Sequence, residues 1–104
     1  MIEIVYYEKE HRVTVSGHAY SGPHGRDVVC SAISVLSFTL AKAVDELDKR
    51  CDLDELTVEL GVGEADISCN GEYPRCIKLI YDTICLGYEA IAESFPDKVS
   101  FARA

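Results

Sequence analysis

The sequence predicts a two-layer α+β domain, in which a mostly antiparallel five-stranded sheet carries two helices on one face. Short segments with apolar residues at alternate positions occur in two pairs, and each pair is joined by a short turn. Two longer segments instead have apolar residues three and four positions apart, which is the helical period. The expected order is strand, strand, helix, strand, strand, helix, strand, and hairpins with helices on one side give two layers.

The first hairpin is expected from residues 2–7 and 11–18, with a polar turn between them. Residues 2–7 alternate as Ile2, Ile4 and Tyr6 against Glu3, Val5 and Tyr7, and the second segment places Val13 and Val15 on one face and polar residues on the other, as in strands. Strict alternation would put His18 on the polar face, away from the helices. Gly17 can change this by allowing a bulge or a sharp change of direction.

The first helix is expected from about residue 27 to residue 50, because apolar residues there recur along one stripe. Its last turns are charged and therefore solvated. The stripe consists of Val29, Ile33, Leu36, Leu40, Ala43, Val44 and Leu47.

The second hairpin is expected from residues 55–61 and 64–70, with a glycine-containing turn between them. The inward side chains would be Leu56, Val58, Leu60, Ala65, Ile67 and Cys69. The opposite face of the sheet would be polar, through Glu3, Arg12, Thr14, Ser16, Thr57, Glu59, Asp66 and Ser68.

Pro74 opens a second expected helix, at about residues 75–95, and residues 99–101 suggest a short last strand. Leu79 and Leu86 lie on a second face of this helix, which one small sheet would not cover. We therefore expect them to form a homodimer contact. The core stripe of the helix would be Ile77, Ile80, Ile84, Tyr88 and Ile91.

The 104 residues are expected to form a single domain, 1–104, with a formal net charge of −8. This charge argues against direct nucleic-acid binding and suits a basic partner, although it also simply favours solubility. No apolar run is expected to span a membrane, and the N-terminal segment is expected to be too short and too acidic to act as a signal peptide. Five cysteines without a CxxC pair, in a chain with no export signal, indicate reduced thiols and a cytoplasmic location.

Residues 17–34 contain the candidate catalytic residues of the sequence. They are expected to form the end of a strand, a glycine-rich loop and the first turn of a helix. Cys30 falls at about the third helical position, where unpaired N–H groups and the positive end of the helix dipole favour a thiolate. A histidine can serve as its base, and both His18 and His24 lie within reach of the loop. Cys51, Cys69, Cys76 and Cys85 are instead expected to be packing residues.

The sequence allows two interpretations for each of two residues near Cys30. Asp27 either caps the helix or orients His18 as in a catalytic triad. Ser34 either forms a hydrogen bond near the thiol or bonds back to the Cys30 carbonyl. The loop that contains Gly22 and Gly25 is either a plain connection or a gate over the substrate.

A zinc site is the main rival chemistry, since His18, His24 and Cys30 are possible ligands. The paired ligands two to four residues apart that structural zinc sites usually show are absent from this sequence.

The segment Gly17-His18-Ala19, followed by Gly22, Gly25, Asp27 and Val-Val-Cys-Ser-Ala-Ile-Ser, resembles the signature of the ribosomal-processing cysteine proteases (Prp). The resemblance extends over the chain in length and element order, but residues 17–36 carry its specific motifs. It implies that His18 and Cys30 are the catalytic pair, with Asp27 and Ser34 in supporting positions. Ser31 departs from the alanine that usually follows the family's cysteine, a small change that should leave the chemistry intact.

The resemblance also implies the activity and the substrate. The chain would be a cysteine endopeptidase without a cofactor, which removes the N-terminal extension of a large-subunit ribosomal protein, the twenty-seventh in the standard naming. Two alternatives remain open from the sequence: a non-catalytic ribosome-associated binding module, and a thiol hydrolase that acts on small molecules.

Overall fold

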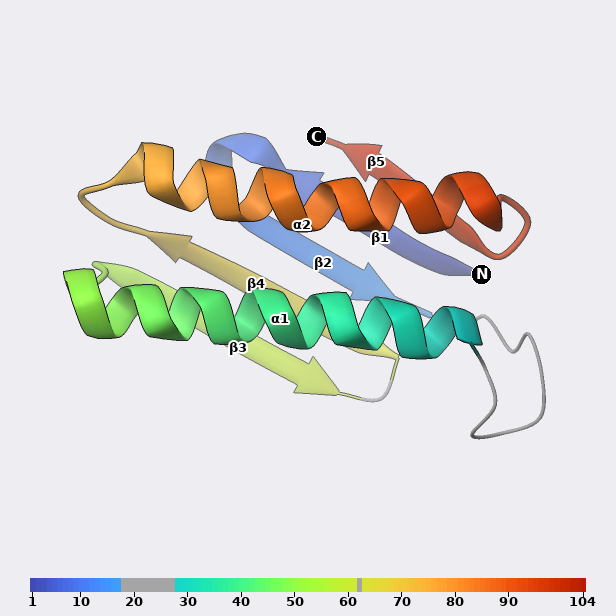
Figure 1. The fold of residues 1–104 in the computed structure, drawn as a ribbon, viewed down its shortest axis with the longest axis horizontal. Helices are drawn as coiled ribbons and strands as arrows, with labels where there is room; N and C mark the ends of the chain where they lie inside the picture. The colour runs from blue at the N-terminus through green and yellow to red at the C-terminus, as the bar shows by residue number, and fades with distance from the viewer. Residues whose placement is uncertain (18–27, 62) are drawn as a thin grey trace.

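One five-stranded sheet forms one layer of the computed structural model, and two antiparallel helices form the other (Figure 1). The structure describes residues 1–17, 28–61 and 63–104. The elements are β1 (Ile2–Tyr7), a 3₁₀ helix η1 (Glu8–Glu10), β2 (Arg12–Ser16), α1 (Val28–Cys51), β3 (Glu55–Gly61), β4 (Glu64–Asn70), α2 (Pro74–Ser94) and β5 (Val99–Arg103). The α+β class and the element order are confirmed.

The strands lie in the order β3-β4-β2-β1-β5. The β1–β2, β2–β4 and β3–β4 pairs are antiparallel, whereas β5 runs parallel to β1. Alternate side chains of β1, β2 and β4 are buried beneath the helices, as the pattern predicts. The other face carries the polar set, in which Arg12 makes two hydrogen bonds to Asp66, at 2.9 and 2.7 Å.

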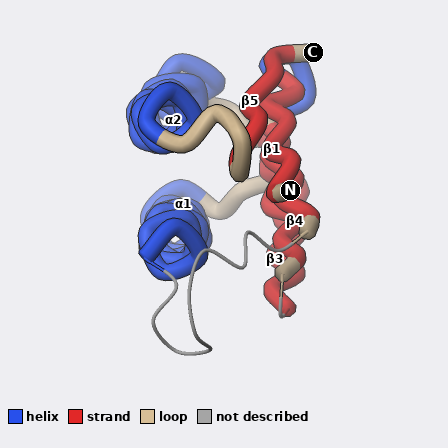
Figure 2. The backbone as a smooth tube through the Cα atoms, turned by 90° about the vertical axis from the view of Figure 1, so that its right-hand side faces the viewer, coloured by secondary structure: helices blue, strands red, loops and turns tan. Residues whose placement is uncertain are grey.

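Both helices cover the same face of the sheet, with α1 over the β3–β4 side and α2 over the β1–β5 side (Figure 2). They pack closely because Gly87 has no side chain: a Cβ there would lie 2.8 Å from a methyl group of Leu36. Four buried helix residues lie outside the predicted stripes: Ser37, Ala41, Tyr81 and Cys85. The Ser37 hydroxyl donates to the Ile33 carbonyl at 2.9 Å and lies 2.8 Å from the Tyr88 hydroxyl.

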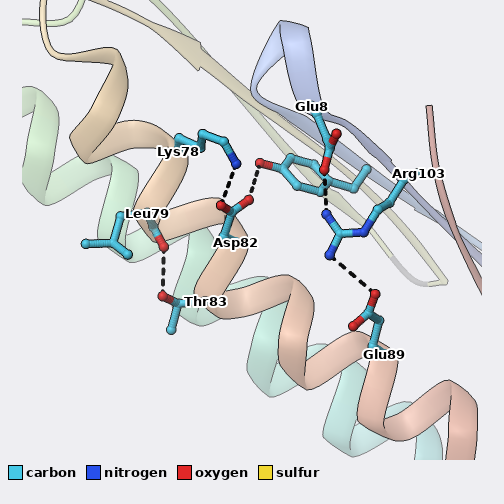
Figure 3. Close-up of polar contacts among 8 residues, drawn as sticks. Glu8, Lys78, Leu79, Asp82, Thr83, Glu89 and Arg103 are labelled. Carbon is cyan, nitrogen blue, oxygen red and sulfur yellow. Dashed lines mark hydrogen bonds and ion pairs between the residues drawn. The ribbon is translucent and has the colours of Figure 1, made fainter.

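A polar cluster joins α2 to the strands (Figure 3). The buried Tyr6 hydroxyl donates to Asp82 at 2.9 Å, and the Lys78 ammonium lies 2.6 Å from the same carboxylate. The Lys78 hydrogen bond is the largest cause that lowers the pKa of Asp82, whereas burial raises the pKa of Tyr6. The remaining ion pairs of the cluster join Arg103 to Glu8 and Glu89.

Val58 and Leu60 turn to the predicted inward face of the sheet, but neither is buried. Both face the helix side, opposite the buried Ile67 and Ala65, but they are 40% and 42% exposed. The reason is that β3 is an edge strand, with β4 on one side and no strand on the other among the described residues.

The expectation that no apolar run can span a membrane is wrong for α1, which is long and apolar enough by length and composition. Core helices of soluble proteins meet the same criteria. In this structure, Val29, Leu40 and Val44 of α1 are fully buried in the core beneath the sheet. We therefore interpret α1 as a core helix.

Candidate active site

Cys30 is the third residue of α1, as the sequence predicts. Val29 and Ile33 are almost fully buried, so they anchor the first two turns of α1 in the core, and Cys30 packs half-buried against the same core. The first N–H groups of a helix have no partner within it, and they form the positive end of its dipole. None of the residues in this first turn is acidic. A thiol in such a position ionises readily and becomes a better nucleophile.

Gly17 fixes the point at which the chain leaves β2. Its φ is +100°, which L side chains rarely adopt, and a Cβ there would overlap the carbonyl oxygen of Met1. Its N–H donates to the Gly63 carbonyl at 2.9 Å. Gly17 therefore ends β2 in a conformation that glycine adopts readily; whether the chain bulges or turns sharply after it stays a prediction, because residues 18–27 lie outside the described part of the chain.

The contacts of Gly17 with Met1 and Gly63 could not be predicted from the sequence. Met1 and Gly63 are far from Gly17 in the chain, and they meet it only because β1 and β4 flank β2 in the sheet. The sequence signal for a special backbone position near Gly17 is the glycine pair in the β3–β4 turn. Glycines with positive φ are common in such turns, and Gly63 has a φ of +73°.

Several predicted site residues lie outside the part of the chain that the structure describes: His18, Gly22, His24, Gly25 and Asp27. Their roles therefore remain predictions. Ser34 is described and exposed, one helical turn after Cys30. The Ser37 and Thr39 hydroxyls bond back to carbonyls four residues earlier, but Ser34 makes no such bond to a described residue.

All five cysteines lie in described positions, and none of them forms a disulfide. Cys69 and Cys85 are buried, as expected, and burial raises the pKa of both thiols, for Cys85 to about 12. Neither is therefore a good nucleophile near neutral pH. The expectation of packing is wrong for Cys76, which is exposed on α2.

A shallow polar hollow of about 420 Å³ lies around the β2–β4–β3 strands, next to η1. Arg12 and Asp66 in its wall already bind each other, and Cys69 beside it is buried. It offers no ready nucleophile. The described residues also contain no group of three histidine, cysteine or acidic side chains that could hold a metal ion.

Comparisons with known proteins agree with this arrangement. The fold resembles two structures of the ribosomal processing protease Prp from S. aureus. One holds a covalently linked product peptide (20% identity, TM-score 0.78), and the other holds a substrate peptide (19% identity, TM-score 0.73). Each match covers 99% of this chain and 97% of the S. aureus chain. SMU.848 from Streptococcus mutans is 25% identical, with a TM-score of 0.68 and coverage of 98% and 90%. No curated protein matches. The family model for the cysteine protease Prp matches residues 1–100, and this chain therefore belongs to the Prp family of cysteine proteases.

Proposed function

We propose that this chain is a cysteine endopeptidase that removes the N-terminal extension of a large-subunit ribosomal protein, the twenty-seventh in the standard naming. Family membership supports a cysteine protease. The similar S. aureus protease is a ribosomal processing enzyme with structures that hold a substrate peptide and a covalently linked product peptide. The position of Cys30 in the anchored first turn of α1 is the observation that carries the proposal.

In the proposed reaction, the Cys30 thiolate attacks the carbonyl carbon of the scissile peptide bond, after His18 has taken the thiol proton. The oxyanion that forms is held by backbone N–H groups at the start of α1, those of Val29 or Cys30. The C–N bond then breaks, and His18 gives its proton to the leaving amine. Water hydrolyses the thioester, which releases the acid product and restores the thiol. No cofactor enters this sequence.

The remaining residues of the loop have supporting roles in the proposal. Asp27 caps α1 or orients His18, and the loop that contains Gly22 and Gly25 closes over the substrate. Ser34 is exposed beside Cys30, one turn along α1, where it can contact bound peptide.

We also propose that the chain works in the cytoplasm as a homodimer, without direct nucleic-acid contacts. Leu79 and Leu86 on α2 are 68% and 63% exposed, and in Figure 3 the Leu79 side chain points away from the strands. Sedimentation tests this contact: Leu86→Glu should shift a dimer toward the monomer. The net charge of −8 suits a basic ribosomal protein as substrate.

Incubation with the extended ribosomal protein, followed by mass spectrometry, tests the activity. The unmodified chain should release the extension, and both Cys30→Ala and His18→Ala should abolish the cleavage while the fold is retained. Cys76→Ala is the matched control, because this thiol is exposed but lies outside the proposed site. Binding without cleavage would indicate a non-catalytic module, and hydrolysis confined to small thioesters would indicate another thiol hydrolase. Either result would contradict the proposal.

A further inference from the structure

The edge strand β3 is seven residues long and pairs with β4 on one side. An edge strand offers a row of unpaired N–H and C=O groups to any other extended chain. Proteins commonly block such an edge with lysine, proline or a bulge, and β3 contains neither lysine nor proline. Among the described residues, this edge is therefore open to strand addition.

The register of the sheet shows which residues of β4 turn toward β2. The Cys69 N–H donates to the His11 carbonyl at 3.1 Å, and the Gly63 carbonyl accepts from the Gly17 N–H at 2.9 Å. In an antiparallel pair, the N–H and C=O of one residue point to the same neighbour, and successive residues alternate. The odd-numbered residues of β4 therefore bond to β2, and the even-numbered ones bond to β3.

The partners of those even-numbered residues are the odd-numbered residues of β3. The residues between them direct their backbone N–H and C=O groups to the outer edge. These are Leu56, Val58 and Leu60.

The same three residues turn their side chains to the helix side of the sheet, where Val58 and Leu60 are 40% and 42% exposed. A further strand at this edge would bring its own side chains beside them and bury this apolar surface. In the described part of the chain, no strand pairs with the backbone groups of this edge, and its apolar side chains are partly exposed.

The negative charge around this edge favours binding of a basic segment. Residues 51–74 contain seven acidic residues and no basic one. Glu55 and Glu59 lie on the open face of β3, on the opposite side from the helices. A second copy of β3 would bring two further carboxylates to the same face of the sheet, and like charges on neighbouring strands repel each other. A basic peptide would neutralise them.

We propose that the outer edge of β3 binds an extended basic peptide as a sixth strand, and that this edge holds the substrate chain for proteolysis. This inference rests on the proposed function. The preferred peptide alternates basic side chains, beside Glu55 and Glu59, with apolar side chains beside Val58 and Leu60. The β3 arrow points toward the end of the molecule at which α1 begins with Cys30 (Figure 1).

Amide hydrogen exchange, measured by NMR on the Cys30→Ala chain, tests the edge directly. The probe is a synthetic ten-residue peptide of alternating lysine and valine, and the control peptide alternates glutamate and valine. Saturating Lys–Val peptide should slow exchange of the Leu56, Val58 and Leu60 amides at least about tenfold, because they gain hydrogen bonds. The Thr57 amide should change little, since it already faces β4. Unchanged edge amides would overturn the proposal.

Kinetics with the ribosomal precursor give an independent readout. Val58→Pro removes one outward N–H and no β4 bond, so it should raise KM by up to about tenfold with a smaller change in kcat. Glu59→Gln should also raise KM, whereas Glu3→Gln, on the open face of the distant strand β1, should not.

The outcomes separate the two proposals. If the unmodified chain leaves the precursor intact, the proposed protease function fails. If it cleaves the precursor while the edge amides stay unprotected and KM is unchanged in Glu59→Gln, the edge proposal fails alone. Protection that appears without peptide and rises with protein concentration would show that a second copy occupies the edge, which also overturns the proposal.

Discussion

Substitution of Gly17 by alanine should be among the most damaging single-methyl changes in this chain. The residue has a φ of +100°, a conformation that costs a residue with a Cβ about 1–3 kcal/mol. The new Cβ would also overlap the Met1 carbonyl oxygen and lie 3.2 Å from the Met1 carbonyl carbon. Backbone atoms cannot rotate away as a side chain can, so β1 and β2 must shift apart. We expect a loss of about 2–4 kcal/mol in the free energy of unfolding.

Urea unfolding of Gly17→Ala, with Gly61→Ala as the matched control, measures this effect. A Cβ at Gly61 would have no atom within 4 Å, and this residue has no positive φ, so its substitution should stay within about 0.5 kcal/mol of the unmodified chain. The Tm of Gly17→Ala should be lower than that of the unmodified chain by roughly 10 °C or more. Cleavage of the precursor by the still-folded fraction should also fall, because Gly17 leads directly into the segment that contains His18. Equal stability of the two variants would refute the reasoning.

Two further predictions concern buried or partly buried polar groups. Ser37→Ala leaves the buried Tyr88 hydroxyl without its 2.8 Å partner and should cost about 1–3 kcal/mol by urea unfolding, whereas the double variant with Tyr88→Phe should recover part of that loss. Additive effects of the two substitutions would contradict this coupling. Asp82 has a lowered pKa, so its contribution to stability is present above the ordinary carboxyl pKa and is lost as the pH falls through the lowered value. Asp82→Asn should therefore destabilise the chain at pH 7 and progressively less below about pH 4, and a deficit that does not depend on pH would argue against the ion pair.

The strands and helices could be predicted from the sequence because each is a local pattern. The period-two alternation in β1, β2 and β4 and the helical period in α1 and α2 are properties of consecutive residues. The face to which Val58 turns could be predicted for the same reason. The exposure of Val58 could not be predicted, because this exposure depends on the position of β3 at the edge of the sheet. The strand order is not a local property of the sequence.

Buried polar residues show the same limit. Ser37 lies on the buried side of α1, but a serine is not expected in a core unless a distant partner satisfies its hydroxyl. That partner is Tyr88, on the other helix. In the candidate site, the helical position of Cys30 followed from the apolar period after it, whereas the contact of Gly17 with Met1 required the paired sheet.

The relative reactivity of two thiols tests the central claim most directly. Cys76 is exposed on α2, whereas Cys30 is half-buried at the start of α1, so accessibility alone would make Cys76 react first with iodoacetamide. If the start of the helix and a histidine make Cys30 a nucleophile, it should be alkylated at least about tenfold faster than Cys76 near pH 7, as peptide mapping by mass spectrometry would show. Alkylation of Cys30 at the rate of Cys76, or more slowly, would contradict the account.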